Sequence, residues 1–376
     1  MTDTMTAGII TAGAAGNWWA WAALRLVADP AAVSAQPTPE GLAHNEFSGT
    51  AGTVVQARDV HGGVHLYPAA EPAPDITPSV RALWQLGVTS GATIELRRLT
   101  EPAGRFLVVR VSAPEQLAAV DLAADLRARL SGAARPMRTE PVESADELRR
   151  ALEPFTPDPR GLVEIHKRLT VARSTRGDAR EPWLAAVTPL RPNPRSWSPL
   201  WTELARFPAV LSVGLLPVRV GPGFRAHLAA QATEMARLAR PGQPATGNWS
   251  VPRPPDPFAV AADPLYAEAV RRYTDQAFTV RVSLAAPLPV SDALAELAAG
   301  TISPVAPDAG FAGAPPVIVR PLSDETAIAW RNIAACNADP LRAAEPAQPV
   351  GQLPRLLTTM ADIEEAAAVF RVAVGA

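Results

Sequence analysis

Histidine is the first residue type to consider for chemistry, because imidazole binds metal ions and exchanges protons near neutral pH. The chain has five: His44, His61, His65, His166 and His227. The spacing of His61 and His65 would put two metal ligands on one face of a helix, but Gly62 and Gly63 between them argue against a helix. On a strand the two side chains would lie about 13 Å apart, too far to share one ion. We therefore expect no bound metal.

The other chemically active residues do not fit a catalytic motif. The only lysine, Lys167, has no glycine-rich loop before it, so the sequence contains no phosphate-binding P-loop. No Gly-x-Ser-x-Gly elbow occurs, and the adjacent carboxylates Glu364 and Glu365 would diverge on a helix. We expect a protein that is not an enzyme and uses no cofactor. An enzyme with a dispersed site is the alternative.

The segment Asn45–Tyr67 has strand-like patterning and lies between two proline-rich flanks. In Val60–Leu66 the valines and the leucine face one way and the histidines the other, and Thr53–Ala57 is a second strand-like run. A segment of high β-propensity and little net charge can stack copies of itself in register. The glutamine at its centre, Gln56, would then form a hydrogen-bonded ladder along the stack.

This segment resembles the bacterial amyloid signalling motifs of actinobacteria, which are similar to the RIP homotypic interaction motif of animal necroptosis adaptors. The resemblance covers only Asn45–Tyr67, and Arg58 stands where many relatives have glycine. It implies a motif, shared between an immune-type sensor and its effector, that templates a cross-β fibre. The alternative is a surface hairpin or glycine-rich linker. The residues that the resemblance assigns to the interaction are Val54, Val55, Gln56, Ala57, Val60, His61, Gly62, Gly63 and Val64.

Composition excludes several classes of partner. The net charge is −2, and no clustered basic excess exists to bind nucleic acid or an anionic membrane. Cys336 is the only cysteine, so an internal disulfide is impossible; a reducing cytoplasm fits, with Cys336 as a small buried hydrophobe. The apolar stretch Trp18–Val27 is interrupted by Arg25 and is too short to span a bilayer. We expect a cytoplasmic protein without a membrane span.

Patterning along the chain predicts an α+β fold, preceded by a flexible N-terminal region that carries the amyloid-like motif. In the N-terminal tail, Asn17 could cap a short tryptophan-rich helix that runs to Ala28. The predicted segments are this tail (1–44), the motif (45–67), a proline-rich linker (68–79), a first α+β unit (80–175) and a second one that ends in a helix (181–376).

Within the first unit, Thr93–Leu99 and Arg105–Ser112 predict a hairpin, followed by a helix to Leu130. Ser144 and Glu147 have the spacing of a capping box for another helix. In the second unit strands and helices alternate, which predicts a mixed strand-helix sandwich of split βαβ-like units with helices on one face. The predicted strands are 183–188, 209–220, 278–284 and 317–321, and the helices are 198–207, 223–239, 264–274, 291–299 and 360–370.

Residues 80–376 also resemble the non-catalytic N-terminal region of HerA–FtsK-type translocating ATPases, including conjugation and type IV secretion ATPases. The resemblance rests on Thr93–Leu96, Phe106–Val111, Phe278–Val282 and, best of all, Met360–Arg371. In those ATPases such a phrase precedes the nucleotide-binding core, whereas this chain stops at Ala376. The resemblance implies a detached regulatory half that works with a separately encoded ATPase. An unrelated α+β domain with alanine-rich helices is the alternative.

Two functional hypotheses follow from these patterns. The first is a non-enzymatic signalling or scaffold protein that forms a homo-oligomer or fibre, or recruits a protein with a similar motif, in bacterial defence or cell-death signalling. The second is an accessory subunit of a separately encoded HerA/FtsK- or secretion-type translocating ATPase, in which the motif is a mere linker.

Overall fold

The structure is a computed structural model that describes residues 4–6, 8–14, 16–27, 75–100, 103–133, 138–193, 197–243, 252–306, 310 and 313–371. It confirms the α+β class, with helices packed on antiparallel sheet. The strands are β1 (Thr4–Thr6), β2 (Ile9–Ala14), β3 (Asn17–Val27), β4 (Thr93–Thr100), β5 (Ala103–Ala113), β6 (Arg138–Pro141), β7 (Val163–His166), β8 (Leu169–Arg173), β9 (Trp183–Val187), β10 (Val210–Arg219), β11 (Gln276–Ala285), β12 (Val317–Val319) and β13 (Met360–Ala361). The helices are α2 (Thr77–Ser90), α3 (Gln116–Ala133), α4 (Ala145–Leu152), α5 (Ser198–Leu204), α6 (Pro222–Leu238), α7 (Pro257–Arg272), α8 (Asp292–Ile302), α9 (Thr326–Ala334), α10 (Gln352–Thr359) and α11 (Ile363–Val369).

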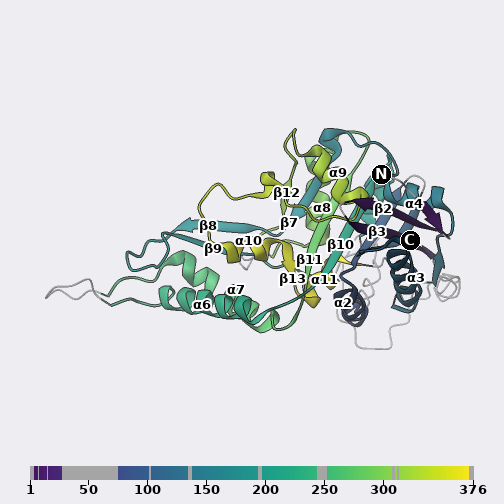
Figure 1. The fold of residues 1–376 in the computed structure, drawn as a ribbon. Coiled ribbons are helices and arrows are strands. Elements are labelled where there is room, and N and C mark those ends of the chain that lie inside the picture. Colours follow the sequence, from purple (N-terminus) through teal and green to yellow (C-terminus); the bar gives the residue numbers. More distant parts are fainter. Residues whose placement is uncertain are drawn as a thin grey trace, which may run out of the picture.

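One large antiparallel sheet runs through the molecule in the order β1-β2-β3-β5-β4-β10-β11-β7-β12, with β6 also paired to β3 and β13 to β11 (Figure 1). The predicted hairpin is present as β4 and β5. Strand β4, from the predicted first unit, pairs with β10 from the second. The strands on the two sides of the expected boundary near residue 175 therefore belong to the same sheet.

The N-terminal residues contribute strands to this sheet, and the prediction of a tryptophan-rich helix was wrong. Strand β3 pairs with β2, β5 and β6, and Ala20 lies opposite Val111 of β5. Leu24 faces one core and Ala23 faces the other, so both faces of β3 are covered. A strand buried on both faces reads as a continuous apolar run, which periodicity alone cannot distinguish from a helix.

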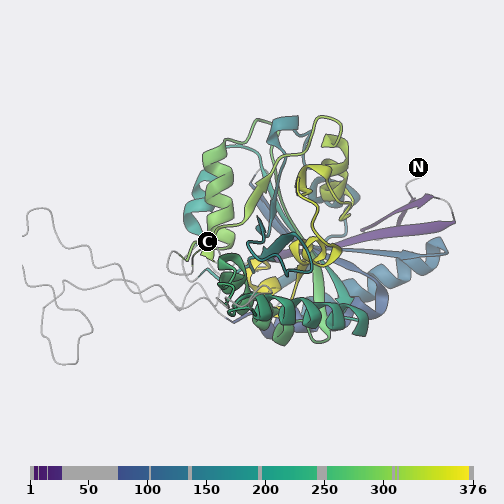
Figure 2. The ribbon, with the colours of Figure 1, turned by 90° about the vertical axis from the view of Figure 1, so that its left-hand side faces the viewer.

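Helices cover both faces of the sheet, rather than one face as predicted (Figure 2). Helices α2, α3, α5, α8 and α11 bury apolar residues in one core, whereas α4 and α9 pack on the opposite face. Helix α2 begins at Thr77, inside the predicted linker 68–79, with Pro78 in its first turn. Within the described ranges, none of the helices combines the length and apolar character that crossing a bilayer requires.

The predicted capping box of α4 is absent. Ser144 occupies the N-cap position, but its side chain makes no capping hydrogen bond. Glu147 instead accepts hydrogen bonds from Arg25 on β3. Because Arg25 is a charged donor, the Glu147 carboxylate forms an ion pair with it and does not accept from the backbone amide of Ser144, as a capping box would require.

A buried charged group, the Glu95 cluster (Glu95, Arg97, Ser212 and Arg281), lies under α4 and α9. The guanidinium of Arg97 is fully buried and donates to the carbonyls of Ala151 and Leu152 at the end of α4, at 2.7 and 2.8 Å. It also donates to Ile333 near the end of α9. Helix C-termini carry unpaired carbonyls and a partial negative charge. A buried guanidinium that donates to these carbonyls therefore stabilises the C-termini of both helices.

Cys336 follows α9 and is buried against the Glu95 cluster, as a small core residue was expected to be. Its thiol lies 3.4 Å from Arg97 Nη2. Burial and the nearby carboxylate of Glu95 raise the pKa of Cys336 to about 12. The thiol therefore stays protonated at neutral pH.

A smaller lobe is built from the β8–β9 sheet with α6, α7 and α10, at the left of Figure 1. Its core includes Leu184 of β9, Met235 of α6 and Leu353 of α10. The hydroxyl of Tyr266 on α7 donates to the carbonyl of Ala185 at 2.7 Å, which ties that helix to β9.

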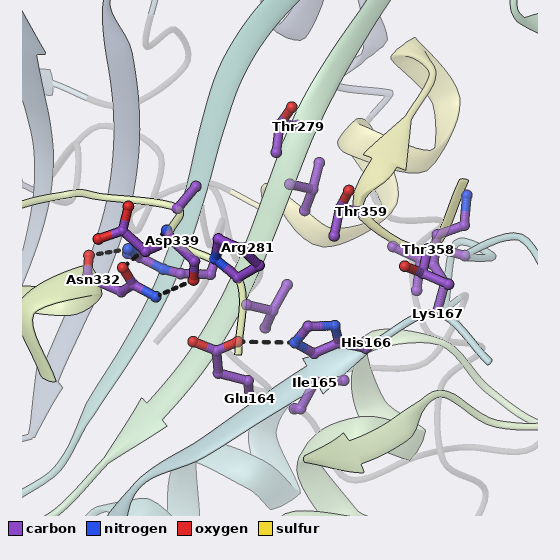
Figure 3. Close-up of a pocket in the computed structure, with 15 residues that line it drawn as sticks. Glu164, Ile165, His166, Lys167, Thr279, Arg281, Asn332, Asp339, Thr358 and Thr359 are labelled. Carbon is purple, nitrogen blue, oxygen red and sulfur yellow. Dashed lines mark hydrogen bonds and ion pairs between the residues drawn. The ribbon is translucent and has the colours of Figure 1, made fainter. Parts of the chain in front are cut away.

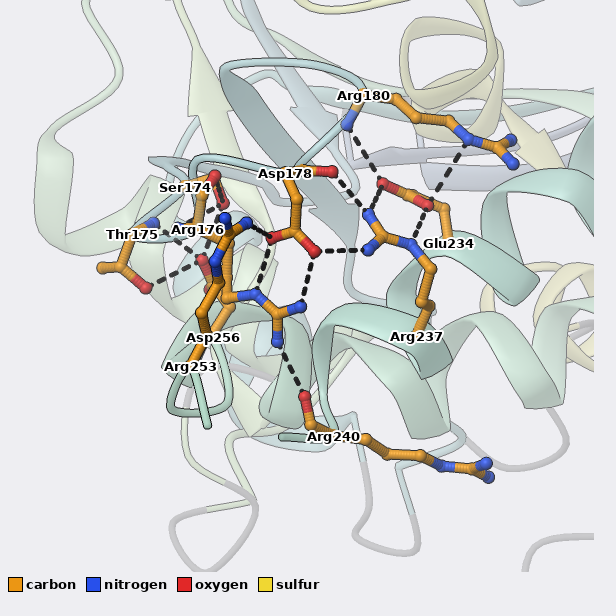
Figure 4. Close-up of polar contacts among 10 residues, drawn as sticks. All are labelled: Ser174, Thr175, Arg176, Asp178, Arg180, Glu234, Arg237, Arg240, Arg253 and Asp256. Atoms are coloured by element: carbon orange, nitrogen blue, oxygen red, sulfur yellow. Dashed lines mark hydrogen bonds and ion pairs between the residues drawn. The ribbon is translucent and has the colours of Figure 1, made fainter. Parts of the chain in front are cut away.

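A polar group joins the β8–β9 loop to α6 and α7 (Figure 4). This Asp178 cluster comprises Thr175, Arg176, Asp178, Arg237 and Asp256. The Asp178 carboxylate accepts from Arg176 at 2.7 and 2.8 Å and from Arg237 of α6 at 2.8 Å. Asp256 caps α7 and accepts from the Thr175 amide at 2.8 Å. The hydrogen bonds from Arg176 outweigh burial and hold the pKa of Asp178 well below its ordinary value. The cluster therefore stays charged at neutral pH.

Asp178→Asn is expected to loosen this loop, because the Arg176 side chain, only 3% exposed, would lose its charged partner. We expect several-fold faster trypsin cleavage within residues 174–181, followed by mass spectrometry. Asp121→Asn, an exposed change on α3, is the matched control and should leave the rate unaltered. Equal cleavage rates for Asp178→Asn and the wild type would contradict the prediction.

Candidate functional site

The interaction residues assigned by sequence, Val54–Ala57 and Val60–Val64, lie outside the described residues. The structure describes the elements on either side of them. Strand β3 ends at Val27 and α2 begins at Thr77. Leu26 of β3 and Val80 of α2 are both buried in the same hydrophobic core.

Among the described residues, a pocket of about 250 Å³ opens at an interrupted edge of strand β11 (Figure 3). On this edge β7 pairs with Ser283 and Leu284, while β13 pairs with Phe278 and Thr279. Strand β10 occupies the opposite edge along the whole of β11. The residues 280–282 between the two short partners therefore line the pocket, together with β7, the loop after α9 and the end of α10.

The lysine and the arginine that line the pocket, Lys167 and Arg281, already form ion pairs. Lys167 Nζ lies 2.8 Å from Glu365 Oε1 and also donates to the carbonyl of Met360. Arg281 Nη2 donates to Glu95 Oε2 at 2.6 Å, and its Nη1 donates to the carbonyls of Asn332 and Asn337. These groups hold the surrounding elements together. Arg281 shares the single carboxylate of Glu95 with Arg97, so this cluster keeps one excess positive charge.

Glu164 and His166 form a carboxylate–imidazole pair in the pocket. They are two residues apart on β7 and share one side of the strand, with Glu164 Oε2 2.8 Å from His166 Nε2. Glu164 is 5% exposed, and its second oxygen, Oε1, is buried without a hydrogen-bond partner. Burying an acceptor without a donor is unfavourable, and Arg281, in the same pocket lining, has a buried Nε that also lacks a hydrogen-bond partner.

The loop after α9 brings a second carboxylate, Asp339, to the rim. Asn332 fixes this loop, because its side chain donates to the Asp339 carbonyl at 2.8 Å and accepts from the Asp339 amide at 3.0 Å. The Asp339 residue is exposed. In the part of the chain that the structure describes, Asp339 forms no salt bridge. Burial lowers the pKa of the Arg110 guanidinium, and the negative charge of Asp339 partly opposes that effect.

The geometry favours binding more than catalysis. A carboxylate and an imidazole in contact could move a proton. However, the hydroxyls of Thr358 and Thr359 donate to carbonyls of their own helix, so they are not aligned on His166. Over the described ranges, no group of three or more His, Cys, Asp or Glu residues is placed to hold a metal ion.

His166 and Lys167 line one pocket, which the sequence patterns considered above do not predict. The signal that could have found it is the alternation of Val163 and Ile165, both buried, with Glu164 and His166. That pattern identifies a short strand with two polar side chains on one side. The contribution of Asp339, far away in the chain, has no such local signal.

Comparison with known proteins adds no family. No protein-family model matches the chain, and a search among curated proteins finds no match.

Proposed function

We propose that this chain is a non-enzymatic signalling or scaffold protein that assembles, or recruits a partner with a similar motif, through cross-β pairing of Asn45–Tyr67. The observation that carries the proposal is the motif itself, with Val54–Ala57 followed by His61–Val64. Its residue types suit in-register stacking, in which each backbone group pairs with the chain above and below.

The position of the motif between two core elements supports this role. Because Leu26 and Val80 belong to one hydrophobic core, the motif is an internal segment tethered at both ends to the same body. Every copy that joined a stack would therefore bring a folded body with it. An assembly of this kind concentrates the bodies along a fibre, and bodies brought close together can engage partners multivalently.

The test is assembly of the full chain with Gln56→Pro. Proline removes a backbone donor and disfavours a central strand, so fibres should disappear. Gln36→Pro, the same change in the flanking segment outside the motif, is the matched control and should assemble like the wild type. Thioflavin fluorescence and fibre diffraction at about 4.7 Å measure the result.

Two outcomes would overturn the proposal. One is a wild-type chain that forms no fibres under any condition in which it stays folded. The other is equal assembly of Gln56→Pro and the wild type. Sonicated wild-type fibres should also shorten the lag of fresh wild-type chain but not that of Gln56→Pro.

A further inference from the structure

A second, smaller cavity lies where the end of β4 meets the start of α5 and the residues that follow α11. We propose that it binds the dianion of a phosphate group through the guanidinium groups of Arg98 and Arg371. This inference concerns a site on the folded body. It does not depend on assembly through Asn45–Tyr67.

The first argument is the arrangement of two arginines around a pair of tryptophans. Arg98 lies on the same side of β4 as the buried Leu96, and its Cζ is 4.0 Å from the centre of the Trp201 ring on α5. Cζ of Arg371 is 5.9 Å from the ring of Trp197, just before that helix. The centres of the two rings are 5.7 Å apart. Contact with a tryptophan face restricts each guanidinium, and all four side chains line the same cavity.

The second argument is the sign of the charge that remains. Among the residues that the structure describes, neither Arg98 nor Arg371 forms a salt bridge. Glu203, on the same helix as Trp201, is already paired with Arg206 at 3.1 Å. Two positive charges at this cavity are therefore left without a counter-charge, and such a site attracts anions.

Burial makes this lack of a counter-charge costly. Burial, followed by the like charge of Arg105 directly across the β4–β5 pair, lowers the pKa of Arg98 to about 10. Burial also lowers the pKa of Arg371. Both groups remain charged at neutral pH while part of their hydration is lost. A bound anion would supply the charge that the fold withholds from them.

The third argument is that donors are accessible to a ligand. Nη1 of Arg98 is enclosed and has no hydrogen-bond partner, but its Nε and Nη2 are not enclosed, and no nitrogen of Arg371 is enclosed. Within the described ranges these accessible nitrogens make no hydrogen bond. A guanidinium presents its N–H groups as a fork that matches the oxygens of a phosphate or a carboxylate.

Size and charge together select phosphate. The cavity measures about 20 Å³, room for about one ordered water, so it admits only the charged tip of a ligand. A phosphate monoester carries roughly two negative charges near neutral pH, which match the two guanidinium groups, whereas a carboxylate carries one. The remainder of a larger ligand would lie outside the cavity.

Calorimetric titration of the full chain with inorganic phosphate, methyl phosphate and dimethyl phosphate tests the proposal. The titrations are made slightly above neutral pH and at constant ionic strength. We expect the first two probes to bind and dimethyl phosphate, which carries a single charge, to bind about tenfold more weakly or not at all. The tighter of the two dianions distinguishes a free phosphate from a phosphate carried on a larger molecule.

Single substitutions locate the binding. Arg98→Gln and Arg371→Gln should each weaken phosphate binding by about tenfold or more, the loss of one charged contact. Arg225→Gln, an exposed change on α6 that removes the same charge, is the matched control and should bind like the wild type. Phosphate should also raise the thermal midpoint of the wild type and of Arg225→Gln, but not that of Arg98→Gln, because a ligand stabilises only the chain that binds it.

Three results would overturn the proposal. One is failure of both dianions to bind at millimolar concentration, and another is dimethyl phosphate that binds as tightly as methyl phosphate. The third is a pair of variants, Arg98→Gln and Arg371→Gln, that are folded by circular dichroism and bind phosphate like the wild type. Arg371 follows the last helix, so its variant remains informative if Arg98→Gln fails to fold. Phosphate binding by Gln56→Pro separates this result from the fate of the assembly proposal.

Discussion

Glu95→Gln is expected to destabilise the folded chain by about 3–5 kcal/mol, the cost of removing one partner from a buried ion pair. The Glu95 carboxylate is fully buried and holds two arginines, with 2.7 Å to Arg97 Nε and 2.6 Å to Arg281 Nη2. Glutamine would leave two buried guanidinium groups without a counter-charge. Arg97 also donates to carbonyls at the end of α4, and Arg281 donates to the Asn332 carbonyl near the end of α9, so the packing of those helices should loosen as well.

Urea unfolding followed by circular dichroism measures this loss as a lower midpoint with an unchanged slope. Glu153→Gln, an exposed change just after α4, is the matched control and should stay within about 0.5 kcal/mol of the wild type. A Glu95→Gln chain that loses less than about 1 kcal/mol would show that the arginines find other acceptors.

The same variant should change how stability depends on pH. Burial alone would raise the pKa of Glu95, but Arg281 and Arg97 outweigh burial and lower the pKa below its ordinary value of 4.5. A lowered folded pKa means that the stabilisation is complete above pH 4.5 and is lost as the pH falls through the folded pKa. Acid unfolding of the wild type should therefore be steeper below this pH than that of Glu95→Gln.

Lys167→Met should have the second largest effect, about 3 kcal/mol, the lower end of the range for breaking a buried ion pair. Lys167 is 6% exposed and Glu365 is 1% exposed, with 2.8 Å between their charged atoms. Methionine would leave the Glu365 carboxylate buried without the charge of Lys167. Glu365 would keep its hydrogen bonds from Tyr273 at 2.6 Å and from the Leu190 amide at 2.9 Å, which limits the loss.

Lys167→Arg is the informative companion variant. Lysine presents a compact charge with three donors, which here meet Glu365, the Met360 carbonyl and the Tyr273 hydroxyl. A planar guanidinium keeps the charge but does not fit the same three acceptors. We expect the urea midpoint of Lys167→Arg to lie between those of the wild type and Lys167→Met. A Lys167→Met chain as stable as the wild type would contradict the prediction.

Because Lys167 is the only lysine, its reaction with an amine reagent also reports opening of this region in the wild type.

Strongly periodic segments were predictable from the sequence. The hairpin β4–β5 lies where two strand-like runs predict it. Strand β10 and helix α6 lie where a long apolar run is followed by an amphipathic helical pattern. Helix α7 begins at Pro257, seven residues before the predicted start, because Asp256 caps it there and Pro264 is tolerated inside. Strand β3 was mistaken for a helix because its neighbours bury both of its faces.

The clusters that hold the fold together could not be predicted from local patterns. Glu95 and Arg281 are adjacent in space because β4 and β11 flank β10, and no spacing rule connects two residues so far apart. The pocket has the same origin, since β7 and β13 are both too short to cover the edge of β11. For the interaction motif, by contrast, sequence is the sole basis, because residues 45–67 lie outside the described ranges.

The anchoring of β3 and α2 in one core has an evolutionary consequence. Each element buries its apolar residues against the sheet and the helices around it. Neither anchor draws its buried residues from positions 28–74. A change of sequence there would leave both anchors in place, so one scaffold could acquire a new recognition sequence without rebuilding its core.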